Sequence, residues 1–128
     1  MAKKIVYWIS TLLVAAQAAI AGVLYLSGAK VMVENFTHVG YPQELRIILG
    51  VGKGLATLAL LAPGFPRLKE WAYAGLCFAW ISAHIAHHRV GDPAREQFIP
   101  LVLLVLLFIS YFTRPGSRKL GAPAKATA

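Results

Sequence analysis

The chain has 128 residues, a formal net charge of +8, and a composition of 58% hydrophobic and 14% charged residues. Soluble domains carry about 25% charged residues, so this composition excludes an ordinary soluble domain and indicates an integral membrane protein. The single cysteine, Cys77, excludes an intrachain disulfide and a paired-thiol relay, and therefore a thiol–disulfide oxidoreductase.

Four predominantly apolar stretches follow one another, at residues 5–26, 45–62, 71–87 and 98–112. A helix needs about 20 apolar residues to cross the hydrocarbon, so flanking residues must complete the shorter stretches. The pattern predicts an all-α fold: a bundle of four transmembrane helices in a single domain over residues 1–112. Residues 113–128 are basic and rich in small residues, and we expect them to form a disordered cytoplasmic tail.

The first stretch follows Lys3 and Lys4, as the apolar part of a signal peptide would. Its apolar run is too long for a signal peptide, and no small-x-small cleavage site precedes polar sequence. We therefore interpret it as a retained helix.

The connection over residues 27–44 ends at Gly40-Tyr41-Pro42, a sequence that breaks a helical path. We expect it to form an extracytoplasmic loop or a short interfacial helix between the first two long helices. Small residues at four-residue spacing favour close helix contacts, at Ala18/Gly22, Gly50/Gly54 and Gly75/Ala79/Ala83.

Basic residues indicate the orientation, because short cytoplasmic segments hold an excess of lysine and arginine. With the N-terminus inside, the cytoplasmic segments contain Lys3, Lys4, Arg67, Lys69, Arg114, Arg118, Lys119 and Lys125, and the outer loops contain Lys30, Arg46, Arg89 and Arg95. Both termini are therefore expected in the cytoplasm. Basic residues beside helix ends interact with anionic lipid head groups. The positive charge therefore does not indicate nucleic-acid binding.

Lys53 is the only charged residue in the middle of an apolar stretch, and Gly52 and Gly54 flank it. An ammonium at this depth costs roughly 3 kcal/mol or more unless a partner or water meets it. Two interpretations stay open. Lys53 extends outward or pairs with a loop carboxylate such as Glu34, or it serves a ligand site.

Polar side chains of the third stretch share one face of its helix. At about 100° per residue, an arc of about 100° holds Tyr73, Cys77, Trp80, His84, His87 and His88. The residues outside this arc are Ala74, Gly75, Phe78, Ala79, Ile81 and Ile85. Lipid would not tolerate the polar face, so we expect it to face the interior of the bundle.

Depth along the helices brings part of this face close to Lys53. His84 lies roughly 8 Å outward of the level of Lys53, within reach of an extended lysine, and Gln17 lies near the middle of the first stretch. We predict a ligand cavity in the outer half of the bundle. Its predicted residues are Lys53, His84 and Gln17, with Trp80 and Tyr73 as walls. No residue stands out as catalytic.

The histidines admit other interpretations. His84 and His88 have the i, i+4 spacing of two ligands on one helix face, which suits a metal ion or haem. The sequence fixes no third ligand, and the same-side candidates are Glu34, His38 and Asp92. Alternatively, His87 and His88 lie at the water interface and His84 forms a hydrogen bond within the bundle.

Three motifs stand out together: Phe36-Thr37-His38-Val39-Gly40-Tyr41-Pro42, Leu49-Gly50-Val51-Gly52-Lys53 and Pro63-Gly64-Phe65-Pro66-Arg67-Leu68-Lys69-Glu70-Trp71-Ala72-Tyr73-Ala74-Gly75. With Gly91-Asp92, they resemble the DoxX-like family of small bacterial four-helix membrane proteins over about residues 5 to 112. The resemblance implies a multi-pass protein of the bacterial inner membrane. Lys53 and Glu70-Trp71 match positions typical of the family, and relatives often have a histidine where His84 lies. The family takes its name from a membrane subunit of an archaeal thiosulfate:quinone oxidoreductase.

Three functions remain open. The first is a membrane subunit associated with quinone or a redox system, which binds a small apolar ligand, with quinone as ligand and a redox enzyme as partner. The second is a non-redox protein that binds or transports a small molecule through the same cavity. The third is a haem- or metal-dependent membrane enzyme that uses His84 and His88. In each case the lipid bilayer surrounds the protein, and self-association stays open.

Overall fold

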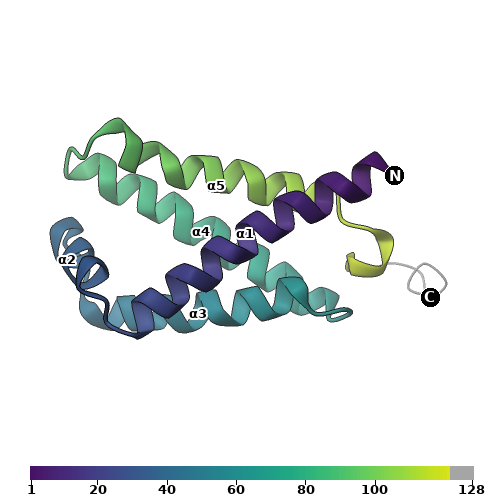
Figure 1. Ribbon diagram of the computed structural model, residues 1–128, viewed down its shortest axis with the longest axis horizontal. Helices are drawn as coiled ribbons and strands as arrows, with labels where there is room; N and C mark the ends of the chain where they lie inside the picture. Colours follow the sequence, from purple (N-terminus) through teal and green to yellow (C-terminus); the bar gives the residue numbers. More distant parts are fainter. Residues whose placement is uncertain (122–128) are drawn as a thin grey trace.

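The computed structural model describes residues 1–121, and over this range the chain is helical, without a strand. The helices are α1 (Ala2–Leu26), α2 (Lys30–Val39), α3 (Gln43–Leu61), α4 (Pro66–Arg89), α5 (Ala94–Phe112) and a short 3-10 helix, η1 (Gly116–Arg118). Figure 1 shows α1 running obliquely across the other long helices, with α2 at one end of the molecule and the N-terminus at the other. The all-α prediction is confirmed, and α2 is the short helix expected between the first two long ones.

The local sequence explains two of the helix boundaries. Gly40 ends α2 in the left-handed conformation, at φ 83°, which glycine adopts without steric cost. Pro66 opens α4 at a position where a backbone N–H would have no helical partner. Phe65, immediately before it, has φ 52°, a conformation that costs energy for a bulky residue. The corner between α3 and α4 is therefore strained.

The long helices form a ring in which α1 and α4 each pack against both α3 and α5. Glycines bring α1 and α3 especially close. A Cβ atom at Gly50 would lie 2.9 Å from Leu26 Cγ, and one at Gly22 would lie 3.3 Å from the Gly50 backbone oxygen. The small-residue spacing in these two stretches therefore predicted a real close contact.

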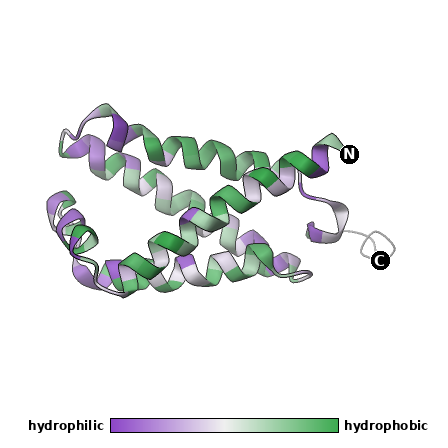
Figure 2. Cartoon of the chain, in the orientation of Figure 1, coloured by the Kyte–Doolittle hydropathy of each residue, from purple (hydrophilic) through white to green (hydrophobic). Residues whose placement is uncertain are grey.

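Large apolar side chains cover the outside of every long helix. Ile9 on α1, Leu58 on α3, Phe78 on α4 and Val102 on α5 are each more than half exposed. Figure 2 shows hydrophilic residues gathered mainly at the two ends of the molecule, with hydrophobic residues along the helices between them. Monomeric soluble proteins rarely expose apolar surface on this scale, so the exterior suits contact with lipid.

Two helices, α1 and α5, are long and apolar enough by themselves to cross a membrane. α3 carries Glu44, Arg46 and Lys53, and α4 carries histidines and aromatic residues along one face. These polar groups lower the hydropathy of α3 and α4. If α3 and α4 also cross a membrane, their mid-helix polar groups must face the interior.

Residues 113–121 fold against the end of the bundle where α1 begins. Arg118 in η1 is 8% exposed and donates hydrogen bonds to the backbone oxygens of Leu60 (2.8 Å) and Leu61 (3.3 Å). These oxygens belong to the last turn of α3, where the helix itself offers no donor. Residues 113–121, the first part of the expected tail, are thus packed against the bundle. Residues 122–128 of the expected tail lie outside the described part.

Candidate ligand-binding site

A cavity of about 350 Å³ lies inside the end of the bundle that α2 closes, and all five α-helices contribute to its lining. Its polar or aromatic lining side chains include Gln17, Tyr25, Asn35, Tyr41, Lys53, Trp80, Ser82 and His87. The structure therefore brings three of the predicted site residues to one cavity, namely Lys53, Gln17 and Trp80. It does not bring His84 or Tyr73 there.

Lys53 is 5% exposed, and its ammonium lies over two aromatic rings. Its Nζ atom is 5.3 Å from the centre of the Trp80 ring and 5.6 Å from that of Tyr25. None of the ion pairs or side-chain hydrogen bonds among residues 1–121 involves this ammonium. Glu34, the carboxylate suggested by the sequence, lies 3.9 Å from Lys30 instead. The contacts between the ammonium and these rings stabilise the protein by about 2 kcal/mol, which is less than the cost of burying the charge.

Gln17 reaches the same cavity from the middle of α1. Its Oε1 atom is buried and accepts no hydrogen bond from the part of the chain that the structure describes. An unsatisfied buried acceptor costs about 1–3 kcal/mol. The cavity therefore combines an amide oxygen and an ammonium that have no hydrogen-bond partners among residues 1–121.

The rotation of α4 agrees with the polar arc seen in the sequence. Tyr73 and Trp80 are 4% and 2% exposed, whereas Phe78 and Ile85 on the opposite face are 72% and 57% exposed. The expectation that the polar face turns inward is confirmed for these positions. His88, at the end of the arc, is exposed.

His84 faces α5 rather than the cavity. Its Nδ1 atom donates to the backbone oxygen of Gln97 at 2.6 Å, and its ring packs against Phe98 at 5.9 Å. His88 Nδ1 lies 3.1 Å from Oε1 of the same Gln97. This arrangement matches the interpretation of His84 as a hydrogen-bonded residue within the bundle. Within residues 1–121, no group of three or more His, Cys, Asp or Glu side chains could hold a metal ion.

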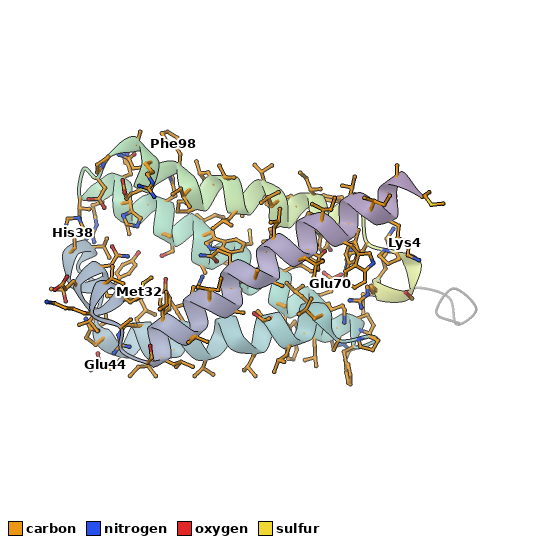
Figure 3. All side chains as sticks on the ribbon, in the orientation of Figure 1. Lys4, Met32, His38, Glu44, Glu70 and Phe98 are labelled. Atoms are coloured by element: carbon orange, nitrogen blue, oxygen red, sulfur yellow. The ribbon has the colours of Figure 1, made fainter. Side chains whose placement is uncertain are left out.

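Tyr73 belongs to a hydroxyl cluster nearer the other end of the bundle. Its OH lies 2.7 Å from Ser110 Oγ, which lies 2.5 Å from Thr11 Oγ1. Tyr73 is two turns before Trp80, roughly 10 Å along α4, so the two share a face but not a depth. Figure 3 labels Glu70, which is near this cluster, at the opposite end of the molecule from His38.

Asp92 joins α2 to the bundle above the cavity. Its carboxylate oxygens lie 2.6 Å from His38 Nε2 on α2 and 2.5 Å from His87 Nδ1 on α4. Hydrogen bonds from His87 and His38 lower the pKa of Asp92 below its ordinary value of 3.8. Arg89 adds a hydrogen bond to the backbone oxygen of Val39 in α2. Together these contacts hold α2 over the cavity.

Sequence reasoning missed His87 as a lining residue and Asp92 as the bridge. His38 and Asp92 are 54 positions apart, so no local spacing connects them. The sequence indicated only that His38 and Asp92 lie at the same expected end of the bundle, next to the outer histidines.

A helical bundle with an apolar exterior, polar ends and two segments able to cross a bilayer has the features expected of a helical membrane protein. The family model of the DoxX-like family matches residues 9–110, and the chain belongs to this family. It is thus a DoxX-like membrane protein. No curated protein and no solved structure matches the chain.

Proposed function

We propose that this protein binds the head group of a quinone in the cavity beneath α2, as a membrane subunit associated with a redox system. The observation that carries the proposal is the ammonium of Lys53, whose side chain is largely buried and lines the cavity, and which has three N–H donors and no acceptor among residues 1–121. A quinone offers carbonyl oxygens as acceptors and no charge of its own. It therefore supplies the acceptor that Lys53 lacks.

The remaining lining supports the same ligand class. Trp80 and Tyr25 provide aromatic walls for a flat ring, and the Gln17 amide adds a second polar contact. The volume of about 350 Å³ is at the lower end for small-molecule sites, which suits a single ring better than a large polycyclic cofactor. A hydrogen bond from a charged donor contributes about 1.5–3 kcal/mol, comparable to the cost that the lysine carries.

The membrane arrangement is part of the proposal. We place all four long helices across the bacterial inner membrane with both termini in the cytoplasm. Their apolar exteriors and the inward polar face of α4 support four crossings. The hydrogen bond of 3.3 Å between Arg118 and Tyr7 OH supports placing the two ends of the described chain on one side, together with the excess of basic residues there.

Two alternatives use the same molecule differently. A non-redox binding or transport-like protein would hold another small acceptor in the cavity, and a haem- or metal-dependent enzyme would use His84 and His88. Extraction of the purified protein followed by a quinone assay separates the first alternative from the proposal. An absorption spectrum and a metal analysis separate the second.

The decisive comparison uses two lysine variants purified from the same membranes. Lys53→Met keeps the apolar stem but removes the ammonium, and Lys30→Met is the control, because the Lys30 side chain is 89% exposed. We expect quinone to co-purify with the parent and with Lys30→Met but not with Lys53→Met. Equal quinone content in all three proteins would refute the proposed site.

A further inference from the structure

A second hollow, an apolar groove of about 700 Å³, runs along the outside of the bundle between α3 and α4. Its rim consists of large apolar side chains that are well exposed, among them Leu55, Leu58 and Trp71 at 62%, 67% and 67%. Its floor is made of small residues: Gly52, Ala56, Ala59, Ala72, Gly75 and Ala79. The groove is therefore open on the side where lipid would lie.

The groove adjoins the cavity described above. Leu49, Lys53, Gly75 and Ala79 line both hollows. Lys53 is the one charged residue in the lining of the groove, and it is 95% buried, with its ammonium on the side of Trp80 and Tyr25. A molecule that lies in the groove can therefore place its head at Lys53 and its apolar part against the outside of the bundle.

The depth of Lys53 limits which molecule this can be. It is ten residues from the start of α3 and eight from its end, or roughly 15 Å and 12 Å along the helix. The head of a phospholipid would have to leave the membrane surface and bury its phosphate at this depth, at a large desolvation cost. A quinone head is uncharged and does not carry that cost.

We infer that the α3–α4 groove holds the apolar tail of a prenylated quinone, which reaches Lys53 sideways from the bilayer. The inference rests on the proposed function, because it assigns the tail of the molecule whose head is bound there. The groove extends from the level of Ile48 and Leu49 to Ala62 and Phe65, and its longer part lies between Lys53 and Ala62. The tail of a molecule whose head is at Lys53 therefore points away from α2. This stretch of α3 is nine residues long, roughly 13 Å.

The test compares two probes, decylubiquinone and the ubiquinone head group without a tail, by quenching of tryptophan fluorescence in one detergent. The matched variants are Gly52→Leu and Gly54→Leu. Both glycines have room for a Cβ atom, with nothing within 4 Å of it, but only Gly52 lines the groove and neither lines the cavity. The tailed probe partitions into detergent to the same extent with every variant, so this partition does not affect the comparison between variants.

We expect the tail to raise the affinity of the parent and of Gly54→Leu by about tenfold or more, since each buried methylene contributes. Gly52→Leu should lose this advantage and bind the tailless head group as the parent does. If the tail raises the affinity of Gly52→Leu as much as that of the parent, the groove assignment is wrong. In that case, loss of tailless-probe binding in Lys53→Met would still support the cavity as the site of the head group. If the parent and Lys53→Met bind the tailless probe equally, the proposed function fails, and the groove inference fails with it.

Discussion

The ammonium of Lys53 lies over the ring of Trp80, with Nζ 5.3 Å from the ring centre. A desolvated contact of this kind stabilises by about 0.5–2 kcal/mol. A double-mutant cycle with Lys53→Met and Trp80→Leu, followed by denaturant unfolding in detergent, should give a coupling energy in that range. Trp71 is 67% exposed, so a cycle of Lys53→Met with Trp71→Leu serves as the control and should show almost no coupling. Equal coupling in both cycles would contradict the aromatic contact.

Two buried lysines make a second contrast. Lys69 is 1% exposed and donates to the backbone oxygens of Ala62 and Gly64, whereas Lys53 has no such acceptor in residues 1–121. Removing the Lys69 ammonium leaves carbonyls without a donor, so Lys69→Met should destabilise the ligand-free protein by about 1–3 kcal/mol. Lys53→Met should leave the ligand-free protein at least as stable as the parent. The midpoint of thermal unfolding measures both, and a comparable loss in the two variants would show that Lys53 has a structural partner.

The third prediction concerns pH and the attachment of α2. The pKa of Asp92 is lowered by hydrogen bonds from His87 and His38, so the folded state gains stability that is fully present above the unfolded value of 3.8. That stability is lost as the pH falls through the lower folded value. Hydrogen exchange of the α2 amides, corrected for intrinsic rates, should therefore show this contribution intact at about pH 5 and weakened only below the ordinary range of aspartate.

A variant at Asp92 checks the same attachment at neutral pH. Asp92→Asn should raise exchange throughout α2. The matched change Glu34→Gln should not, because the Glu34 carboxylate is exposed and is 3.9 Å from Lys30 on the same helix. If the two variants exchange alike, α2 is held by other contacts, such as the one from Arg89 to Val39.

Topology can be tested with single cysteines in a Cys77→Ser background. Pro63 and Ala94 are both exposed and lie at opposite ends of α4. Four crossings predict that Pro63→Cys reacts with a membrane-impermeant thiol reagent only from the cytoplasm and Ala94→Cys only from outside. A reporter fused after the last residue should be active in the cytoplasm. Labelling of both cysteines from one side would show that α4 does not cross the membrane.

Some features of the site could be predicted from the sequence because they depend on one unusual residue type in an apolar stretch and on the helical spacing of polar residues. A single charge in an apolar stretch and a polar arc on one helix placed Lys53 and Trp80 near each other, and their depth added Gln17. The choice between His84 and His87 could not be made in this way. Both lie on the same arc, and the structure separates them because the Gln97 backbone oxygen on α5 accepts a hydrogen bond from His84.

The segment after α5 shows a different limit. Its basic, small-residue composition is typical of disordered chains. Yet Arg114 and Arg118 are 7% and 8% exposed, since Arg114 pairs with Glu70 at 2.8 Å and Arg118 donates to the last carbonyls of α3. These partners lie more than 40 positions away in the chain, so composition alone carries no sign of them.

The contact between Gly22 and Gly50 has a mechanical consequence. Backbone meets backbone where α1 crosses α3, so this seam is stiff, whereas the α3–α4 seam is a groove bounded by side chains that can change rotamer. Any widening of the bundle should therefore move α4 away from α3 and leave α1 in place. The strained corner at Phe65 lies at the foot of that seam and is the natural pivot for such a movement.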